Sequence, residues 1–351
     1  MMTGKTNPGN FFEDFQLGQE IIHATPRTVT EGDAALYTAL YGSCFAAPSS
    51  DMFAMSLGYE GAPMDDLLVF HMVFGKTVAD ISLNAVANLG YAAGRFGAAV
   101  YAGDTLRAVS RVIGLKENSN GKTGVVYVQS TGLNQREEPV LDYVRWVMVN
   151  KADPSSAAPE TVIPDLDPFV GEANLIVPES LDLSNYDTAL SGSGLMWGDY
   201  DIGDKIDHVN GMTIEEADHM MATRLYQNTA KVHFNQHVES AGRFGRRIVY
   251  GGHVISLARS LSYNGLANAF HIVAINGGTH IAPTFAGDTI YAWTEVVGKM
   301  TIPGRDDLGA LRLRMVATKD QDCAAFPDRD ASGKPDPAMV LELDFTVLIP
   351  R

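Results

Sequence analysis

The sequence predicts an α+β fold that occurs twice, each copy being an antiparallel β-sheet wrapped around one apolar helix. Two observations lead to this prediction. Residues 12–21 reappear at 197–206, and the offset of 185 residues continues without a gap as far as Tyr41 and Tyr226. In each copy, an apolar segment with helical periodicity precedes segments that partly alternate apolar and polar residues. A repeat of this length is too long for a solenoid unit, so it indicates duplication of a whole fold.

The first helix of each copy is expected after Thr28 and after Thr213. Thr213 and Glu216 have the spacing of a capping box, in which the two side chains satisfy free amides at the start of a helix. The stretch 215–225 is rich in Ala and Met, which favour helix. The second copy therefore predicts a capped helix at this place.

The central apolar helix of the second copy is expected at 252–263, because Val254, Leu257 and Leu261 recur there at helical spacing. Its counterpart in the first copy is expected at about 71–83. Short turns join the strand-like segments that follow, which predicts an antiparallel meander around the helix. These segments are 105–115, 124–129 and 140–149 in the first copy, and 288–297, 311–316 and 341–347 in the second.

A segment rich in Pro, Ser and Asp separates the two copies, as is typical of a connection between domains. We therefore expect an N-terminal copy at 1–151, a linker at 152–189 and a C-terminal copy at 190–351. With 351 residues in total, each copy is long enough to bury its own core.

The composition excludes several classes of protein. The net charge of −16 argues against nucleic acid as a partner, since phosphates demand a basic surface. No apolar run is long enough to span a bilayer, and residues 1–15 lack the pattern of a signal peptide. The two cysteines, Cys44 and Cys323, are too few for a disulfide framework. We expect a cytoplasmic protein without a membrane partner.

Two short motifs resemble a known family. Residues 12–18 and the Ala-Gly-Asp-Thr found at 102–105 and 286–289 are similar to the MaoC-like dehydratases, the (R)-specific enoyl-CoA hydratase family. The resemblance implies a double hot-dog fold. In that family a loop carries Gly-Asp-x-Asn-Pro-x-His, whose Asp and His form the catalytic pair. His233 falls on the motif histidine and Asn228, five residues earlier, on the motif aspartate. The resemblance thus implies that His233 and Asn228 are catalytic.

The first copy lacks both side chains, because Ser43 and Pro48 stand at the equivalent positions. Neither can usefully exchange a proton. Seven of the nine histidines also fall in the second copy, which we therefore expect to be the active one. Asn228 cannot act as a general base but can orient a water or an imidazole; the alternative is a loop-capping residue. For His233 the alternative is a structural histidine.

The segment that leads into the second central helix matches the Val-x-Gly segment of the family. Free amides at a helix start, together with the helix dipole, favour the negative charge that develops on a thioester oxygen. We expect the amide of Gly252 or His253 to be this oxyanion donor, with Tyr250 and Gly251 contacting the substrate. The alternative is that the two glycines only form the turn into the helix.

The resemblance implies reversible hydration of an enoyl-CoA, most closely of mesaconyl-CoA to β-methylmalyl-CoA, by a homo-oligomer that needs no cofactor. That acyl group carries a free carboxylate, and arginine is the natural partner for such a group when it is desolvated. Arg243, Arg246 and Arg247 have a second interpretation, in which they contact the phosphates of CoA or only solvent. The full set of candidates is Arg95, Arg224, Arg243, Arg246, Arg247 and Arg259.

Three other functions remain open: a hydratase of monocarboxylic acyl-CoA, a hot-dog acyl-CoA thioesterase, and a non-catalytic acyl-CoA binder. A thioesterase would use a carboxylate on the central helix, which is present as Asp80 in the first copy but absent from the second. His233 and His237 have the spacing of a metal-binding pair on a helix, but no third ligand follows in a recognisable pattern. We therefore expect no metal site.

Overall fold

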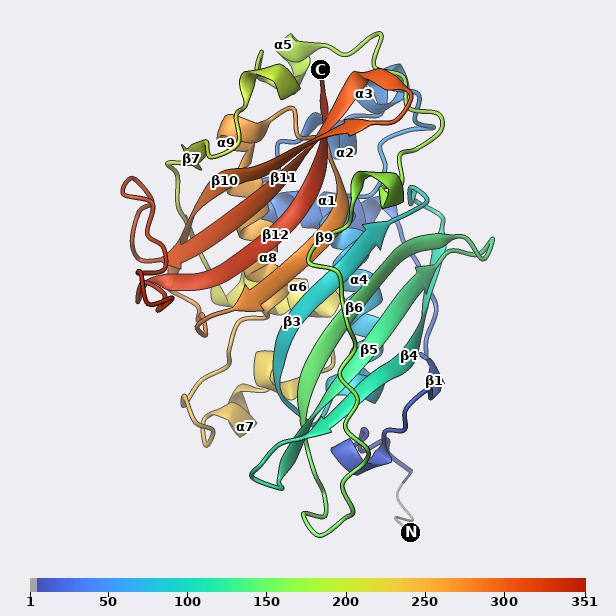
Figure 1. The fold of residues 1–351 in the computed structure, drawn as a ribbon, viewed down its shortest axis with the longest axis vertical. Helices are drawn as coiled ribbons and strands as arrows, with labels where there is room; N and C mark the ends of the chain where they lie inside the picture. The colour runs from blue at the N-terminus through green and yellow to red at the C-terminus, as the bar shows by residue number, and fades with distance from the viewer. Residues whose placement is uncertain (1–4) are drawn as a thin grey trace.

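The computed structural model describes residues 5–351 and contains one antiparallel sheet of twelve strands. Helices cover one face of this sheet (Figure 1). Residues 1–4, which we assigned to the first copy, lie outside the described residues. The strands of the first half are β1 (Glu20–Ile22), β2 (Arg27–Thr28), β3 (Ala85–Phe96), β4 (Thr105–Glu117), β5 (Thr123–Leu133) and β6 (Pro139–Asn150). Those of the second half are β7 (Lys205–Asp207), β8 (Met212–Thr213), β9 (His271–His280), β10 (Thr289–Ile302), β11 (Arg305–Lys319) and β12 (Met339–Pro350).

Equivalent strands of the two copies follow in the same order when the sheet is read inward from its two edges. It runs β1-β4-β5-β6-β3 in the first half and β9-β12-β11-β10-β7 in the second, with β2 beside β4 and β8 beside β10. The halves join where β3 pairs with β9, from Tyr91 opposite Gly278 to Arg95 opposite Ala274. The six predicted strands are present. We missed β3 and β9, because their Ala, Gly and Asn residues hide the alternation typical of a strand.

The helices of the first half are α1 (Glu31–Tyr41), α2 (Ala46–Ser49), α3 (Asp51–Ser56) and α4 (Asp66–Thr77). Those that follow are α5 (Thr188–Ser191), α6 (Glu216–Leu225), α7 (Gln236–Glu239), α8 (Gly251–Leu261) and α9 (Tyr263–Leu266). A 3-10 turn, η5 (Lys231–His233), precedes α7, and single 3-10 turns η1 (Phe12–Asp14), η3 (Glu172–Asn174) and η4 (Trp197–Asp199) stand elsewhere. No described helix is long and apolar enough to cross a membrane.

The two central helices are α4 and α8. The predicted helix at 252–263 is confirmed as α8, which ends at Leu261. Our placement of its counterpart at 71–83 was wrong: α4 begins at Asp66, and from Val78 to Ser82 it continues only as a π-helical turn, η2. The start is set by Asp65, whose Oδ1 accepts a hydrogen bond from the Leu67 amide at 2.9 Å.

The capping box predicted at Thr213 is wrong. Thr213 belongs to β8, where its hydroxyl is 2.8 Å from that of Thr289, and α6 begins after Glu215 without a side-chain cap. A capping box is present instead at α1, where Thr30 accepts from the Asp33 amide and the Asp33 carboxylate accepts from the Thr30 amide. Glu215 is the repeat equivalent of Thr30, so the second copy has lost the capping hydroxyl.

The segment between the halves crosses the face of the sheet opposite the helices (Figure 1). Val162 forms an isolated bridge with Leu115 of β4, and the Val170 amide donates to Asn276 of β9 at 2.9 Å. The guanidinium of Arg312 lies 4.4 Å from the centre of the Phe169 ring. These contacts hold the segment on the sheet, while the domain boundaries at 151 and 190 stay a prediction.

The asymmetry of the caps leads to a stability prediction. Thr30→Ala should lower the free energy of unfolding by about 1 kcal/mol, because α1 loses the acceptor for one of its free amides. The matched control is Thr28→Ala, which removes an exposed hydroxyl outside the helix and should change it by less than about 0.5 kcal/mol. Urea denaturation measures both. Equal losses in the two variants would contradict the assigned cap.

Candidate active site

An approximate twofold axis relates the two halves, because residues 185 positions apart contact each other. The hydroxyls of Tyr41 and Tyr226 are 2.7 Å apart, and Nε2 of His71 lies 3.0 Å from the Ser256 hydroxyl. A residue can touch its own repeat equivalent only close to such an axis. The start of α8 consequently lies against the middle of α4, where the His71 ring is close to Gly252. The pocket at the start of α4 is lined by residues of both halves.

His233 ends the turn η5 and is half-buried. Its Nδ1 lies 3.0 Å from the carbonyl oxygen of Ile248. A carbonyl can only accept, so Nδ1 carries the hydrogen and Nε2 keeps its lone pair. Burial lowers the pKa of the imidazole to about 4, so the ring is neutral at neutral pH. The ring packs edge-on against Tyr250, with 5.6 Å between ring centroids. His233 thus has the neutral charge state and the free Nε2 lone pair that a general base requires.

Asn228 is buried in the loop after α6. Its Oδ1 accepts a hydrogen bond from the Ala230 amide at 3.0 Å, and its own amide donates to the Thr223 carbonyl at 3.1 Å. No hydrogen bond joins Asn228 to His233 among residues 5–351. The structure therefore shows a loop-capping role for the side-chain oxygen, and a part in catalysis stays a prediction.

The start of α8 offers amide donors without an acceptor among the described residues, at Gly251 and at Gly252. The amide of His253 donates to the Tyr250 carbonyl at 2.8 Å, whereas no described residue accepts a hydrogen bond from the Gly252 amide. Gly252 has room only for a hydrogen, because a Cβ there would overlap the rings of Tyr250 and His71. A Cβ at Gly251 would likewise overlap the ring of His280. Of our two candidates for the oxyanion donor, this geometry favours Gly252 over His253.

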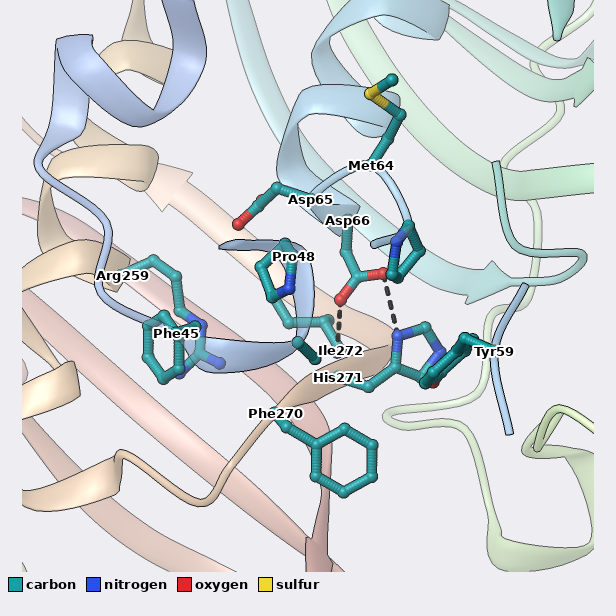
Figure 2. Close-up of a pocket in the computed structure, with 12 residues that line it drawn as sticks. Phe45, Pro48, Tyr59, Met64, Asp65, Asp66, Arg259, Phe270, His271 and Ile272 are labelled. Atoms are coloured by element: carbon teal, nitrogen blue, oxygen red, sulfur yellow. Dashed lines mark hydrogen bonds and ion pairs between the residues drawn. The ribbon is translucent and has the colours of Figure 1, made fainter. Parts of the chain in front are cut away.

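The equivalent pocket of the first half is closed to the same chemistry. Pro48 stands in place of the histidine, and Asp65 stands at the position of Tyr250 (Figure 2). The Asp65 carboxylate accepts from the Leu67 amide, which is the repeat equivalent of the Gly252 amide. Asp66 pairs with His271 at 2.9 Å and accepts from the Ile272 amide. A carboxylate of the chain itself therefore occupies the donor that a thioester oxygen would need.

The predicted arginines do not gather at one place. Arg259 lies in the first-half pocket, stacked on Phe45 with 3.7 Å to the ring centre, and is bonded to the carbonyl of Ala269. It is seven residues beyond Gly252, or roughly 10 Å along α8. Arg95 is paired with Asp142 on the sheet. The remaining candidates are also spread out. Arg224 is exposed in the last turn of α6. In the loop before α8, Arg243 and Arg246 are exposed and Arg247 pairs with Glu216.

The comparisons with known proteins place the chain. A profile of the mesaconyl-CoA hydratase family matches residues 3–332. The chain belongs to this family. A β-methylmalyl-CoA dehydratase from Chloroflexus aurantiacus is 68% identical over 350 residues, which cover 100% of this chain and 99% of the relative. A mesaconyl-CoA hydratase from Cereibacter sphaeroides is 57% identical and covers 99% of this chain and 100% of its own.

Solved structures agree with membership of the mesaconyl-CoA hydratase family. A crystal structure of a protein described as a MaoC domain dehydratase from Chloroflexus aurantiacus superposes with a TM-score of 0.97 at 68% identity, covering 99% of both chains. Rv0216 from Mycobacterium tuberculosis, described as a double hotdog fold, has a TM-score of 0.76 at 26% identity and covers 98% of this chain and 99% of its own. The predicted double hot-dog fold and hydro-lyase class are thereby confirmed.

Sequence reasoning missed four residues beside this family member's site. His71 and Tyr91 come from the first half, which we had treated as silent, and so does Arg145 of β6. His280 ends β9, and its Nε2 is 3.3 Å from the Tyr91 hydroxyl. The only available signal was the repeat itself, because a twofold arrangement brings each half to the pocket of the other.

The bond from Ala230 to Asn228 predicts different effects for two substitutions. Asn228→Asp should keep most of the activity, since a carboxylate oxygen can accept from the same amide. Asn228→Ala leaves that amide without its acceptor, which costs roughly 1–3 kcal/mol of loop stability and should lower turnover clearly. Steady-state rates on an enoyl-CoA measure the effect. An Ala variant with the rate of the unmodified protein would remove Asn228 from any functional role.

Buried neutral histidines predict that acid destabilises the fold well above the pKa of ordinary carboxylates. Burial lowers the pKa of five imidazoles to about 3 or 4: His71, His208, His233, His253 and His280. Between about pH 6.5 and pH 4 the unfolded chain binds more protons at these groups, so stability falls as the pH falls. The contribution of Asp65 to stability rises as the pH falls, because burial raises its pKa to about 6. It is one group against five, so the histidines dominate.

Urea denaturation at pH 6.5 and pH 5.0 checks this balance. The free energy of unfolding should fall by at least about 2 kcal/mol between the two values. A stability that is flat or rises over this interval would show that the histidines are not held neutral.

Proposed function

We propose that this protein catalyses the reversible hydration of mesaconyl-CoA to β-methylmalyl-CoA, and that it does so at the pocket of the second half. The names of the two relatives describe these two directions of one reaction, and the chain matches both along their full length. The observation on which the site assignment depends is a neutral His233, held by Ile248, beside a helix start with an unused amide at Gly252.

In this proposal the thioester oxygen of the substrate accepts a hydrogen bond from the Gly252 amide. When the water oxygen bonds to the β-carbon, the electron pair of the double bond moves to the α-carbon and on to that oxygen. The amide and the positive end of the α8 dipole stabilise this enolate. The donor is fixed before the substrate arrives, so it needs no reorganisation during the reaction.

In this proposal His233 acts first as the general base and then as the general acid. Its Nε2 takes a proton from water while the water oxygen bonds to the β-carbon of the acyl group. The imidazolium then gives that proton to the α-carbon, the enolate collapses to the thioester, and His233 returns to its neutral form. The sum is one water added across one double bond, with no oxidant or reductant. The edge-on Tyr250 ring keeps the imidazole in place.

The loop between α7 and α8 is suited to the CoA moiety. Arg243 and Arg246 are exposed, stack on Phe244 and Phe285, and form no ion pair among the described residues. We propose that they meet the phosphates of CoA, because free cations are what such groups need on a protein of net charge −16.

Removal of the base tests the site. His233→Ala should lower kcat by about a hundredfold to ten-thousandfold while the protein stays folded, as for the loss of a general base. The matched control is Ser43→Ala at the site of the first half, which should change kcat by less than about twofold. If both variants behave alike, catalysis does not depend on the second half.

A single assay separates the proposed function from the alternatives. The protein is mixed with mesaconyl-CoA or crotonyl-CoA, and the enoyl-thioester absorbance and free thiol are followed together. Loss of absorbance without free thiol, faster on mesaconyl-CoA, supports the proposal. A preference for crotonyl-CoA indicates a monocarboxylic hydratase, release of thiol indicates a thioesterase, and no change with either substrate indicates a binder; each of these outcomes contradicts the proposal.

A further inference from the structure

Arg145 of β6 is a buried cation for which the described chain supplies no anion. Its side chain is fully buried. One guanidinium nitrogen donates to the Thr77 hydroxyl at 2.7 Å, and the Ser82 hydroxyl lies 3.4 Å away. No carboxylate of residues 5–351 pairs with it, and its Nε has no hydrogen-bond partner among them. The guanidinium lies 4.3 Å from the centre of the Phe74 ring.

A second polar group beside Arg145 is also without a partner. Tyr143 stands two residues earlier on β6, so both side chains point to the same face of the sheet. Its hydroxyl is buried beside those of Thr77 and Ser130 and forms no hydrogen bond of ordinary length and angle with a described residue. A buried charge is costly unless it is paired, and a buried donor is costly unless it is bonded. Two adjacent unmatched donors indicate that a ligand supplies the acceptor.

The side chains that surround Arg145 also contact residues at the start of α8. Phe74, under the guanidinium, packs 5.6 Å from Tyr250, and Tyr250 packs 5.6 Å from His233, as distances between ring centroids. Near Arg145 stands also Tyr91, whose hydroxyl reaches His280, and the His280 ring lies against Gly251. Phe74 and Tyr250 thus stand between Arg145 and the proposed base, and Tyr91 and His280 stand between Arg145 and the helix start.

We propose that Arg145, together with the hydroxyl of Tyr143, binds the free carboxylate of the acyl group and so selects a dicarboxylic acyl-CoA. This step rests on the proposed function. The two carbonyl carbons of mesaconyl-CoA lie at opposite ends of a trans double bond. With the thioester oxygen at Gly252, the carboxylate points away from the helix start. A guanidinium fork matches a carboxylate with two hydrogen bonds.

The other arginine that is buried among residues 5–351, Arg259, does not fit this role. Arg259 is buried as well, but it lies in the first-half pocket, where the carboxylates of Asp65 and Asp66 offset its charge. The pKa of Arg145 is affected by the hydroxyls of Tyr91, Tyr143 and Tyr250, and no carboxylate among residues 5–351 pairs with its guanidinium. The two buried arginines therefore differ: carboxylates of the described chain lie near Arg259, whereas none pairs with Arg145.

The test compares two substrates on one protein. In Arg145→Met, kcat/KM for mesaconyl-CoA should fall at least about a hundredfold more than kcat/KM for crotonyl-CoA. Crotonyl-CoA has a methyl group in place of the carboxylate and lacks the methyl branch, whose effect cancels when each variant is compared with the unmodified protein. The ratio of the two values is insensitive to the folded fraction, because unfolded protein lowers both equally. Arg145→Lys, which keeps the charge but loses the fork, should fall in between.

Controls keep the outcomes distinguishable. Arg259→Met should leave the ratio unchanged, and Tyr143→Phe, which removes one hydroxyl, should raise KM for mesaconyl-CoA only. If crotonyl-CoA is turned over too slowly, the dissociation constants of the two thioesters in the His233→Ala background replace the rates. Equal losses on both substrates in Arg145→Met overturn this inference alone. A folded unmodified protein that leaves mesaconyl-CoA unchanged overturns the proposed function instead.

Discussion

The pairing of β3 with β9 is the interaction on which the arrangement of the site depends. It joins two halves of one sheet across an approximate twofold axis, and thereby sets α4 and α8 against each other. The hydroxyl contact between Tyr41 and Tyr226 marks that axis. Because the start of each helix faces the other half, neither pocket belongs to one copy. The first half therefore remains necessary, because its residue His71 lies against the helix start at which we place the chemistry.

A few substitutions at the helix starts are enough to make the two pockets differ. In the first half Asp65 caps its own helix, and Pro48 stands where a base would be needed. In the second half Tyr250 cannot cap the helix through its side chain, so the Gly252 amide stays unused. Oxyanion binding and self-capping compete for the same donor. Both halves thus retain the same fold, while only the start of α8 retains the free amide that the start of α4 has lost to Asp65.

Local signals in the sequence predicted the fold, the position of α8 and the glycines at its start, because periodicity and repeat offset act over short distances. They failed where long-range packing decides. Tyr91 of β3 contacts His280 of β9 only through the junction of these two strands, which no local pattern showed. The role that we propose for Arg145 depends on the same junction. Thr213 matched a capping pattern but belongs to β8, where it pairs with Thr289 of β10. Arg259 follows the glycines in sequence, yet the length of α8 carries it to the other pocket.

In the arrangement that we propose, the start of α8 holds the thioester and Arg145 holds the carboxylate of one substrate molecule. A crystal structure of the His233→Gln variant with mesaconyl-CoA would show both contacts, since the ligand is bound without turnover. We expect one acyl-CoA per chain, with the thioester oxygen within hydrogen-bond distance of the Gly252 amide and the carboxylate on Arg145. An acyl group in the first-half pocket at Asp65, or one whose carboxylate turns to solvent away from Arg145, would contradict it.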